Sequence, residues 1–134
     1  MFLNKLQKRL KQEESGFTLI ELLIVLVIIG ILLAIAVPSY LGFKDRANDT
    51  AAKANVRSAV PAVEAYYADN GTYVGMIIGV TGPPATGLKA IDAGVSLTAV
   101  SGQTATSYCI SSTVGGKIWR KVGPGGTIVA GATC

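Results

Sequence analysis

The sequence predicts an α+β protein in which one long N-terminal helix packs on a small antiparallel β-sheet head. Two compositional halves support this fold class: 15 of the 20 charged residues lie in positions 1–70, and 13 of the 16 glycines lie in positions 71–134. The first half shows apolar and then amphipathic helical patterns, whereas the second half shows short strand-like runs between glycine turns. The 134 residues leave room for one small folded domain.

The composition argues against an enzyme. The chain contains no His, and therefore lacks the usual general base near neutral pH and the commonest metal ligand. The sequence shows no carboxylate pair, Cys–His arrangement, phosphate-binding loop or metal-ligand spacing. We therefore expect no catalytic residue, no cofactor and no metal site.

Residues 17–37, FTLIELLIVLVIIGILLAIAV, form an apolar segment with one charged residue, Glu21. At ~1.5 Å per residue this segment spans roughly 31 Å, about the thickness of the hydrocarbon core of a bilayer. Four basic residues precede it and none follows for several positions, so the positive-inside rule places the N-terminus in the cytoplasm and the head outside it. These basic residues are Lys5, Lys8, Arg9 and Lys11.

Two other interpretations of this segment are a secretory signal peptide, with Ala34-Ile35-Ala36 as its cleavage site, and an ordinary signal anchor. The apolar run is too long for the first, and neither explains Glu21. A charged residue deep in a membrane helix costs ~2.5–3.5 kcal/mol on insertion scales. Glu21 therefore requires a partner or a role.

The residues around Glu21, Gly16-Phe17-Thr18-Leu19-Ile20-Glu21, follow a short basic leader. From about Ser15 to Tyr40 the sequence closely resembles the processing motif of type IV pilins and pseudopilins. The resemblance implies that a prepilin peptidase cuts between Gly16 and Phe17, removing a leader of residues 1–16, and that Phe17 is then N-methylated. It further implies that Glu21 pairs with the amino terminus of Phe17 in a neighbouring subunit, so that each charge offsets the desolvation of the other.

Residues 17–38 are predicted to be the transmembrane and filament-core helix. Gly30 and Pro38 weaken it, and pilins of this family are often extended here in assembled pili, so we interpret residues 30–38 as a site of helix flexibility. An equal alternative is that membrane helices simply tolerate both residues.

Residues 39–70 are predicted to be an amphipathic helix that continues the first. Its apolar stripe has helical spacing and comprises Ala52, Val56, Ala59, Val63 and Tyr67. Asp49 and Lys53 are spaced for an i,i+4 ion pair, and Pro61 should kink the helix. The helix is expected to run from Phe17 to Ala68 and to stop at Asn70-Gly71.

Residues 71–134 are predicted to be the globular head. One helical turn is expected over residues 86–91, and strands are expected over 95–100, 107–114, 117–122 and 127–130. Gly115-Gly116 marks a two-residue hairpin, and residues 123–126 mark another turn. The aromatic residues Tyr66, Tyr67, Tyr73 and Trp119 are most simply packing residues.

Cys109 and Cys134 lie in the segment predicted to be outside the cytoplasm, where a disulfide is expected. The pairing resembles the C-terminal disulfide loop of many type IV pilins; two free thiols are the alternative. Lys117, Arg120 and Lys121 form a small basic cluster that is better explained as a solvated strand edge than as a nucleic-acid site.

The resemblance implies a structural subunit, the major pilin of a type IV pilus, that assembles with itself into a helical homopolymer. The expected partners are prepilin peptidase, an assembly platform and the bacterial inner or plasma membrane. The expected location is that membrane before assembly and the extracellular filament afterwards. The alternatives are a pseudopilin of a type II secretion or competence system, and a minor pilin that binds DNA or surfaces.

Overall fold

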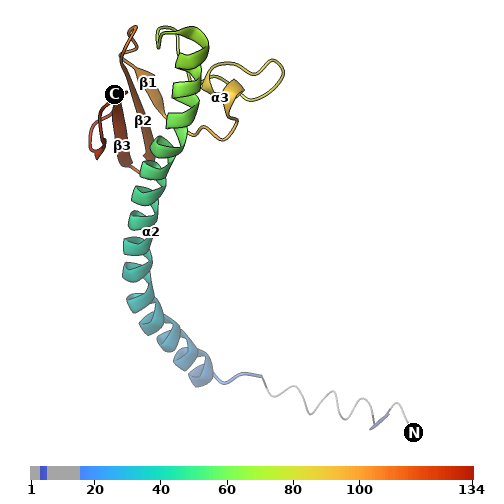
Figure 1. Ribbon diagram of the computed structural model, residues 1–134. Coiled ribbons are helices and arrows are strands. Elements are labelled where there is room, and N and C mark those ends of the chain that lie inside the picture. Colours follow the sequence, from blue (N-terminus) through green and yellow to red (C-terminus); the bar gives the residue numbers. More distant parts are fainter. Residues whose placement is uncertain (1–3, 6–15) are drawn as a thin grey trace. The chain divides into compact units, whose positions relative to one another are not determined.

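The computed structural model describes residues 4–5 and 16–134 (Figure 1). The chain divides into two compact units, Met1–Leu41 and Gly42–Cys134. Most of the predicted leader, residues 1–16, lies outside the described residues.

One helix, α2, runs from Leu19 to Asn70. The prediction of a single long helix is confirmed, with each end two residues later than expected. The predicted stop is also confirmed: the Gly71 amide donates to the Tyr67 carbonyl at 2.7 Å, and Gly71 has a φ of 67°, the left-handed conformation that commonly ends a helix at glycine. The helix continues through Gly30, Pro38 and Pro61.

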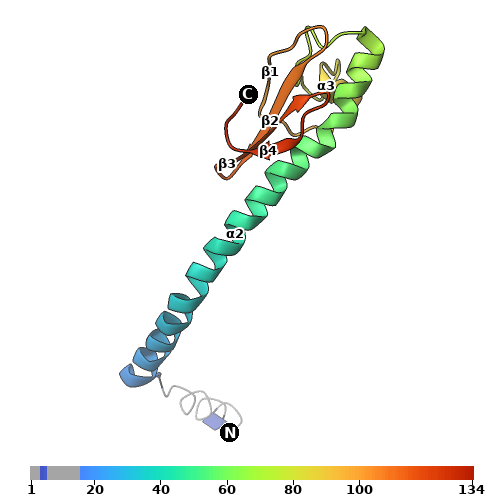
Figure 2. The ribbon, with the colours of Figure 1, turned by 60° about the vertical axis from the view of Figure 1, so that its left-hand side comes forward.

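The head carries a four-stranded antiparallel meander in the order β1-β2-β3-β4, as predicted. The strands are β1 (Ala99–Ser101), β2 (Tyr108–Val114), β3 (Lys117–Gly123) and β4 (Ile128–Ala130), and a short helix, α3 (Leu88–Ile91), precedes them. Gly115 and Gly116 form the β2–β3 turn with φ values of 53° and 80°, as the tight turn of a two-residue hairpin requires. Figure 2 shows the sheet beside the C-terminal part of α2.

The first strand differs from the prediction. A strand was expected over residues 95–100, but β1 covers only Ala99–Ser101. Val95 instead closes a turn by donating to the Asp92 carbonyl at 3.1 Å, and the Ser96 carbonyl accepts a hydrogen bond from the Ser112 hydroxyl at 3.2 Å. A turn and a side-chain hydrogen bond thus take up backbone groups of this stretch, and its backbone pairing with β2 begins only where the Thr98 amide donates to the Ser111 carbonyl.

The core lies between α2 and the sheet. Four of the five residues of the predicted apolar stripe are buried, namely Ala52, Val56, Ala59 and Val63, and Tyr67 packs against the same core. Tyr108 and Ile110 face the helix from β2, while Met76 and Leu88 close the core from the connecting segment. Two hydrogen bonds join α2 to β2, one between Asn55 and Ser112 and one between Glu64 and Tyr108. The nine-residue step along the helix and the four-residue step along the strand both span roughly 13 Å, so the two bonds can form together.

Three aromatic rings and a carboxylate line the far end of this core. Tyr73 lies between Tyr67 and Tyr108, with ring centroids 4.6 and 4.7 Å apart, and both Tyr73 and Tyr108 donate hydrogen bonds to Glu64. Burial, and then the nearby Glu64 charge, raise the pKa of Tyr73 and of Tyr108 above the ordinary tyrosine value. The prediction that the tyrosines are packing residues is confirmed.

The predicted ion pair between Asp49 and Lys53 is wrong. The Trp119 indole donates to the Asp49 carboxylate at 2.9 Å, and the Lys53 ammonium lies 4.7 Å from the centre of the same indole. A partly buried indole N–H needs an acceptor, and the ammonium gains a cation–π contact instead. Both side chains therefore tie α2 to β3.

Candidate functional site

The first turn of α2 is closed by a reciprocal cap. The Thr18 backbone amide and hydroxyl both donate to one Glu21 carboxylate oxygen, each at 2.9 Å. The Glu21 amide approaches the Thr18 hydroxyl at 3.3 Å in return. This is a capping box, in which the residue before the helix and the residue three positions into it satisfy each other's backbone donors.

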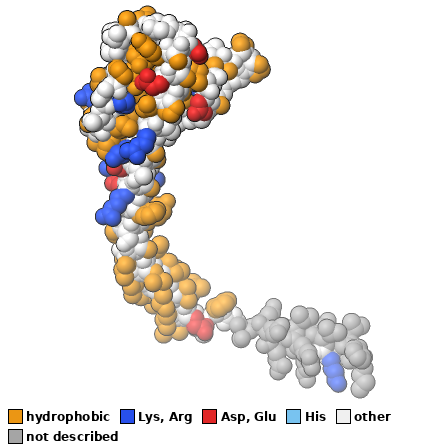
Figure 3. Space-filling model, viewed as in Figure 1, with side chains coloured by type: hydrophobic (Ala, Val, Ile, Leu, Met, Phe, Trp, Pro, Cys, Tyr) orange, Lys and Arg blue, Asp and Glu red, His pale blue; other side chains and the backbone are white. Residues whose placement is uncertain are grey.

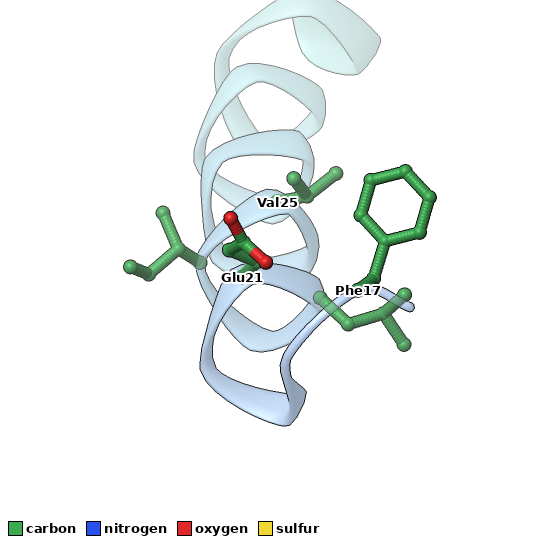
Figure 4. Close-up of a pocket in the computed structure, with 5 residues that line it drawn as sticks. Phe17, Glu21 and Val25 are labelled. Carbon is green, nitrogen blue, oxygen red and sulfur yellow. The ribbon is translucent and has the colours of Figure 1, made fainter. Parts of the chain in front are cut away.

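Beyond this cap, the surroundings of Glu21 are apolar. Phe17, Leu22, Ile24 and Val25 line an open hollow with it, and Glu21 is the one charged residue among them. Figure 4 shows Phe17 on the non-helical stretch of chain that enters α2, and the Glu21 carboxylate on the first turns of the helix. A carboxylate at this place can accept a further donor from outside the chain, because each carboxylate oxygen offers two lone pairs.

The helix segment that follows presents its apolar side chains outward. Between Phe17 and Phe43 the large hydrophobic residues are exposed by 46% at Ile29 to 90% at Leu19, and Figure 3 shows them covering the first turns of α2. This helix is long and apolar enough to cross a membrane. Exposed apolar surface on this scale marks a membrane or protein contact.

The other predicted site residues occupy distinct places in the fold. Gly16 and Phe17 lie in exposed, non-helical chain directly before α2, so the predicted cleavage point adjoins the cap. Gly30 and Pro38 are helical and exposed, and a Cβ at Gly30 would meet nothing within 4 Å. The structure thus groups Gly16, Phe17 and Glu21 and leaves the two flexibility residues further along the helix.

The predicted disulfide is confirmed. Cys109 in β2 is bonded to Cys134, with their Cα atoms 5.6 Å apart. In the basic cluster, Lys117 lies 3.8 Å from the Asp45 carboxylate and Lys121 donates to the Gly126 carbonyl. Two of the three cluster cations therefore have partners within the chain, one on α2 and one in the head.

Thr18 is the functional residue that the sequence interpretation missed. Its signal was present, since a Ser or Thr three residues before an acid at the start of an apolar run is the signature of a capping box. Only the free-energy cost of the Glu21 charge in a membrane was considered at the sequence level. The cap adds an intrachain role to that residue.

Within residues 4–5 and 16–134, no three His, Cys, Asp or Glu side chains come together as a metal site would require.

Residues 11–37 match the model of the prokaryotic N-terminal methylation motif. The chain is 42% identical over 111 residues to the type IV wide pilus major component PilA4 of Thermus thermophilus, which covers 82% of each protein. The chain belongs to the type IV pilin and pseudopilin family. No solved structure matches it.

Other relatives of this pilin-family chain match over shorter stretches. The type II secretion system core protein G of Pseudomonas aeruginosa is 41% identical over 63 residues, 47% of this chain and 44% of its own length. The type IV major pilin PilA of Myxococcus xanthus is 40% identical over 65 residues, and this match covers 48% of this chain and 30% of its own length. Each of these relatives is named as a pilus or secretion-system component. The long N-terminal helix packed on a small antiparallel sheet is the architecture expected of the family.

Proposed function

We propose that this protein is the major structural subunit of a type IV pilus. The observation that supports it best is the extent of the match to the wide pilus component: 111 aligned residues cannot fit within positions 1–70, so the likeness includes the head. The match to protein G covers 63 residues. Likeness in the head bears on function because the heads form the outer surface of the proposed filament.

The start of α2 supplies the assembly chemistry in this proposal. Prepilin peptidase removes residues 1–16 by cutting between Gly16 and Phe17, and Phe17 is then N-methylated. The new ammonium of Phe17 in one copy pairs with the Glu21 carboxylate of a neighbour. Since an unpaired charge in an apolar bundle is costly, this pairing favours one stagger between copies.

The exposed apolar segment supports the proposed location. Before assembly it spans the bacterial inner or plasma membrane, with the head outside the cytoplasm, and an assembly platform then transfers it into the core of an extracellular filament. In both settings its side chains leave water, which offsets their exposure in the single chain. Residues 30–38 are the proposed flexible stretch, because Gly30 and Pro38 weaken the helix there.

The processing step is tested by the intact mass of the membrane-extracted protein. We expect the loss of residues 1–16 and the gain of one methyl group. An unprocessed chain, or cleavage after Ala36, would overturn the proposal. As a matched variant, Gly16→Leu should leave the full-length chain in the membrane, whereas Gly42→Leu should be processed normally.

The match to protein G supports a second candidate, a pseudopilin of a type II secretion system. The two candidates differ in what a deletion strain loses. Sheared surface filaments made mostly of this chain would support the pilus subunit. Absence of such filaments together with a defect in protein export would support the pseudopilin.

A further inference from the structure

The dipeptide Asn70-Gly71 ends α2 on the surface of the head. Both residues are exposed, and a Cβ at Gly71 would meet nothing within 4 Å. Asparagine is a thermolabile residue, because the backbone nitrogen of the next residue can attack its side-chain amide carbon. Glycine is the most permissive neighbour for this attack, since it has no side chain to hinder the approach. The exposed dipeptide therefore has the composition of a site that modifies itself.

The folded last turn of α2 holds both reacting groups in other contacts. The Asn70 side-chain amide donates to the Tyr66 carbonyl at 2.9 Å, and the Gly71 amide donates to the Tyr67 carbonyl at 2.7 Å. The attack requires the Gly71 nitrogen to turn toward the Asn70 side chain, whereas its hydrogen bond directs it back along the helix. Reaction therefore requires the last turn to open.

Contacts on both sides of the dipeptide resist this opening. Tyr73, just beyond it, is buried in the core, and its ring centroid lies 4.6 Å from that of Tyr67. The Tyr66 hydroxyl donates to the Val74 carbonyl at 3.2 Å, which ties the helix to the chain that leaves it. The backbone of the dipeptide is thus held from both ends, although it lies in water.

We propose that Asn70 is a site of spontaneous deamidation that the folded head suppresses, so that its conversion records the opening of the last turn of α2. The Gly71 nitrogen bonds to the Asn70 side-chain carbon and gives up its proton, and ammonia leaves, which closes a succinimide ring. Water then adds to one ring carbonyl and breaks the bond between that carbon and the nitrogen. Attack on the side-chain carbonyl gives aspartate, and attack on the backbone carbonyl gives isoaspartate.

The product of this reaction cannot restore the original cap. A carboxylate at position 70 has no N–H to donate to the Tyr66 carbonyl. It also places a negative charge next to the exposed Asp69, at the end of a helix whose last turn has no basic residue. Negative charge is unfavourable there, because the terminal carbonyls already carry the negative end of the helix dipole. Conversion therefore makes later opening of the same turn easier.

The rate of conversion tests the proposal in the full chain, extracted in detergent and kept either folded or in denaturant with its disulfide intact. Mass spectrometry of the peptide that contains Asn70 detects the replacement of NH2 by OH. We expect conversion in denaturant, and conversion at least about tenfold slower in the folded chain, where the turn opens only transiently. No conversion in denaturant, or equal rates in the two states, would overturn the proposal.

Asn55 is the internal control in the same samples. The branched side chain of Val56 hinders the equivalent attack there, so Asn55 should convert far more slowly than Asn70 in denaturant. Equal rates at the two positions would show that asparagine reacts without regard to its neighbour, which contradicts a specific site at Asn70.

A pair of tyrosine variants tests the protection by the last turn. Tyr66→Phe removes the hydroxyl that bonds to Val74, so it should raise the folded-state rate several-fold and leave the rate in denaturant unchanged. Tyr40→Phe removes a hydroxyl from an exposed tyrosine elsewhere on α2 and should change neither rate. A folded-state rate in Tyr66→Phe equal to that of the unmodified chain would contradict the protective role of this contact.

Two substitutions at Asn70 test the consequence of conversion. Asn70→Asp and Asn70→Ala both remove the donor to the Tyr66 carbonyl, but only Asn70→Asp adds the charge. The head of Asn70→Asp should therefore melt at a lower temperature than the heads of Asn70→Ala and of the unmodified chain. If all three melt alike, conversion does not weaken the turn, and this part of the proposal is wrong.

Discussion

Two stretches of the same helix behave in opposite ways. Along Leu19–Leu41 the large apolar side chains are exposed, as at Ile28 with 50%. Along residues 52–63 the apolar side chains are small, yet Ala52, Val56 and Val63 are all fully buried. Hydrophobicity alone therefore does not decide burial in this chain.

The difference shows where the stability of each stretch comes from. The head unit, Gly42–Cys134, packs one face of its part of α2 against the sheet and the segment from Tyr73 to Leu88, so its core is complete within one chain. The apolar stretch has no such cover in a single chain and gains its free energy of burial from a membrane or from other copies. Substitutions should therefore separate assembly from head stability.

The largest separation is expected at Glu21. Glu21→Ala should still insert into the membrane and leave the melting temperature of the head unchanged, but filament yield should fall about a hundredfold because the neighbour's ammonium loses its carboxylate. Sheared filaments and membrane fractions measure both effects. Glu21→Gln is the control, since it can still cap Thr18; normal filaments from that variant would assign the residue to capping alone.

A matched pair of isoleucines sharpens the comparison. Ile110→Ala should destabilise the head by about 2–5 kcal/mol, because it empties a fully buried core position. Ile28→Ala removes the same atoms from an exposed position and should leave the unfolding of the head in detergent unchanged. Denaturant titration followed by Trp119 fluorescence measures both, and equal losses would contradict the division of the chain.

The disulfide should have a smaller effect that is confined to the head. Replacing both Cys109 and Cys134 with Ser opens a loop with a sequence separation of 25, which the chain-entropy model values at ~3.5 kcal/mol within a usual range of about 2–4. The reduced stability should appear as a lower denaturation midpoint. Membrane insertion should not change, and a loss of insertion would show that the head controls it.

The smallest effect should come from alkaline pH. The raised pKa of buried Tyr108 means that the unfolded chain releases this proton first, so head stability is full below the unfolded tyrosine value, about pH 10, and declines as the pH rises above it. Tyr108→Phe should weaken this decline, with thermal melting between pH 8 and pH 11 as the measurement. An unchanged slope in Tyr108→Phe would place the pH dependence elsewhere.

Much of the fold was predictable because its signals are local. The apolar run, the stripe from Ala52 to Val63 and the glycine pairs each follow from short-range periodicity or turn chemistry. The start of β1 and the partners of Asp49 were not predictable in this way. They depend on Ser112 and Trp119, which lie 16 or more residues away in the sequence and meet them only after the sheet has formed.

The site residues show the same difference between local sequence signals and contacts that only the folded chain makes. The Gly16-Phe17 motif and Glu21 are evident in the sequence, and the capping signature at Thr18 was equally local but was overlooked. The orientation of Glu64 by two tyrosines is different, because one donor is nine residues away and the other is 44. Only the folded head brings these three groups together.

The cap at the start of α2 has a consequence for reversibility. In a lone chain the Glu21 carboxylate already accepts two hydrogen bonds from Thr18. Under the proposed assembly, a neighbour's ammonium must therefore exchange with or share these bonds, and the net gain is smaller than for a bare carboxylate. A subunit that leaves the filament regains its own cap. The residue that directs the addition of a subunit therefore also lowers the free-energy cost of its removal.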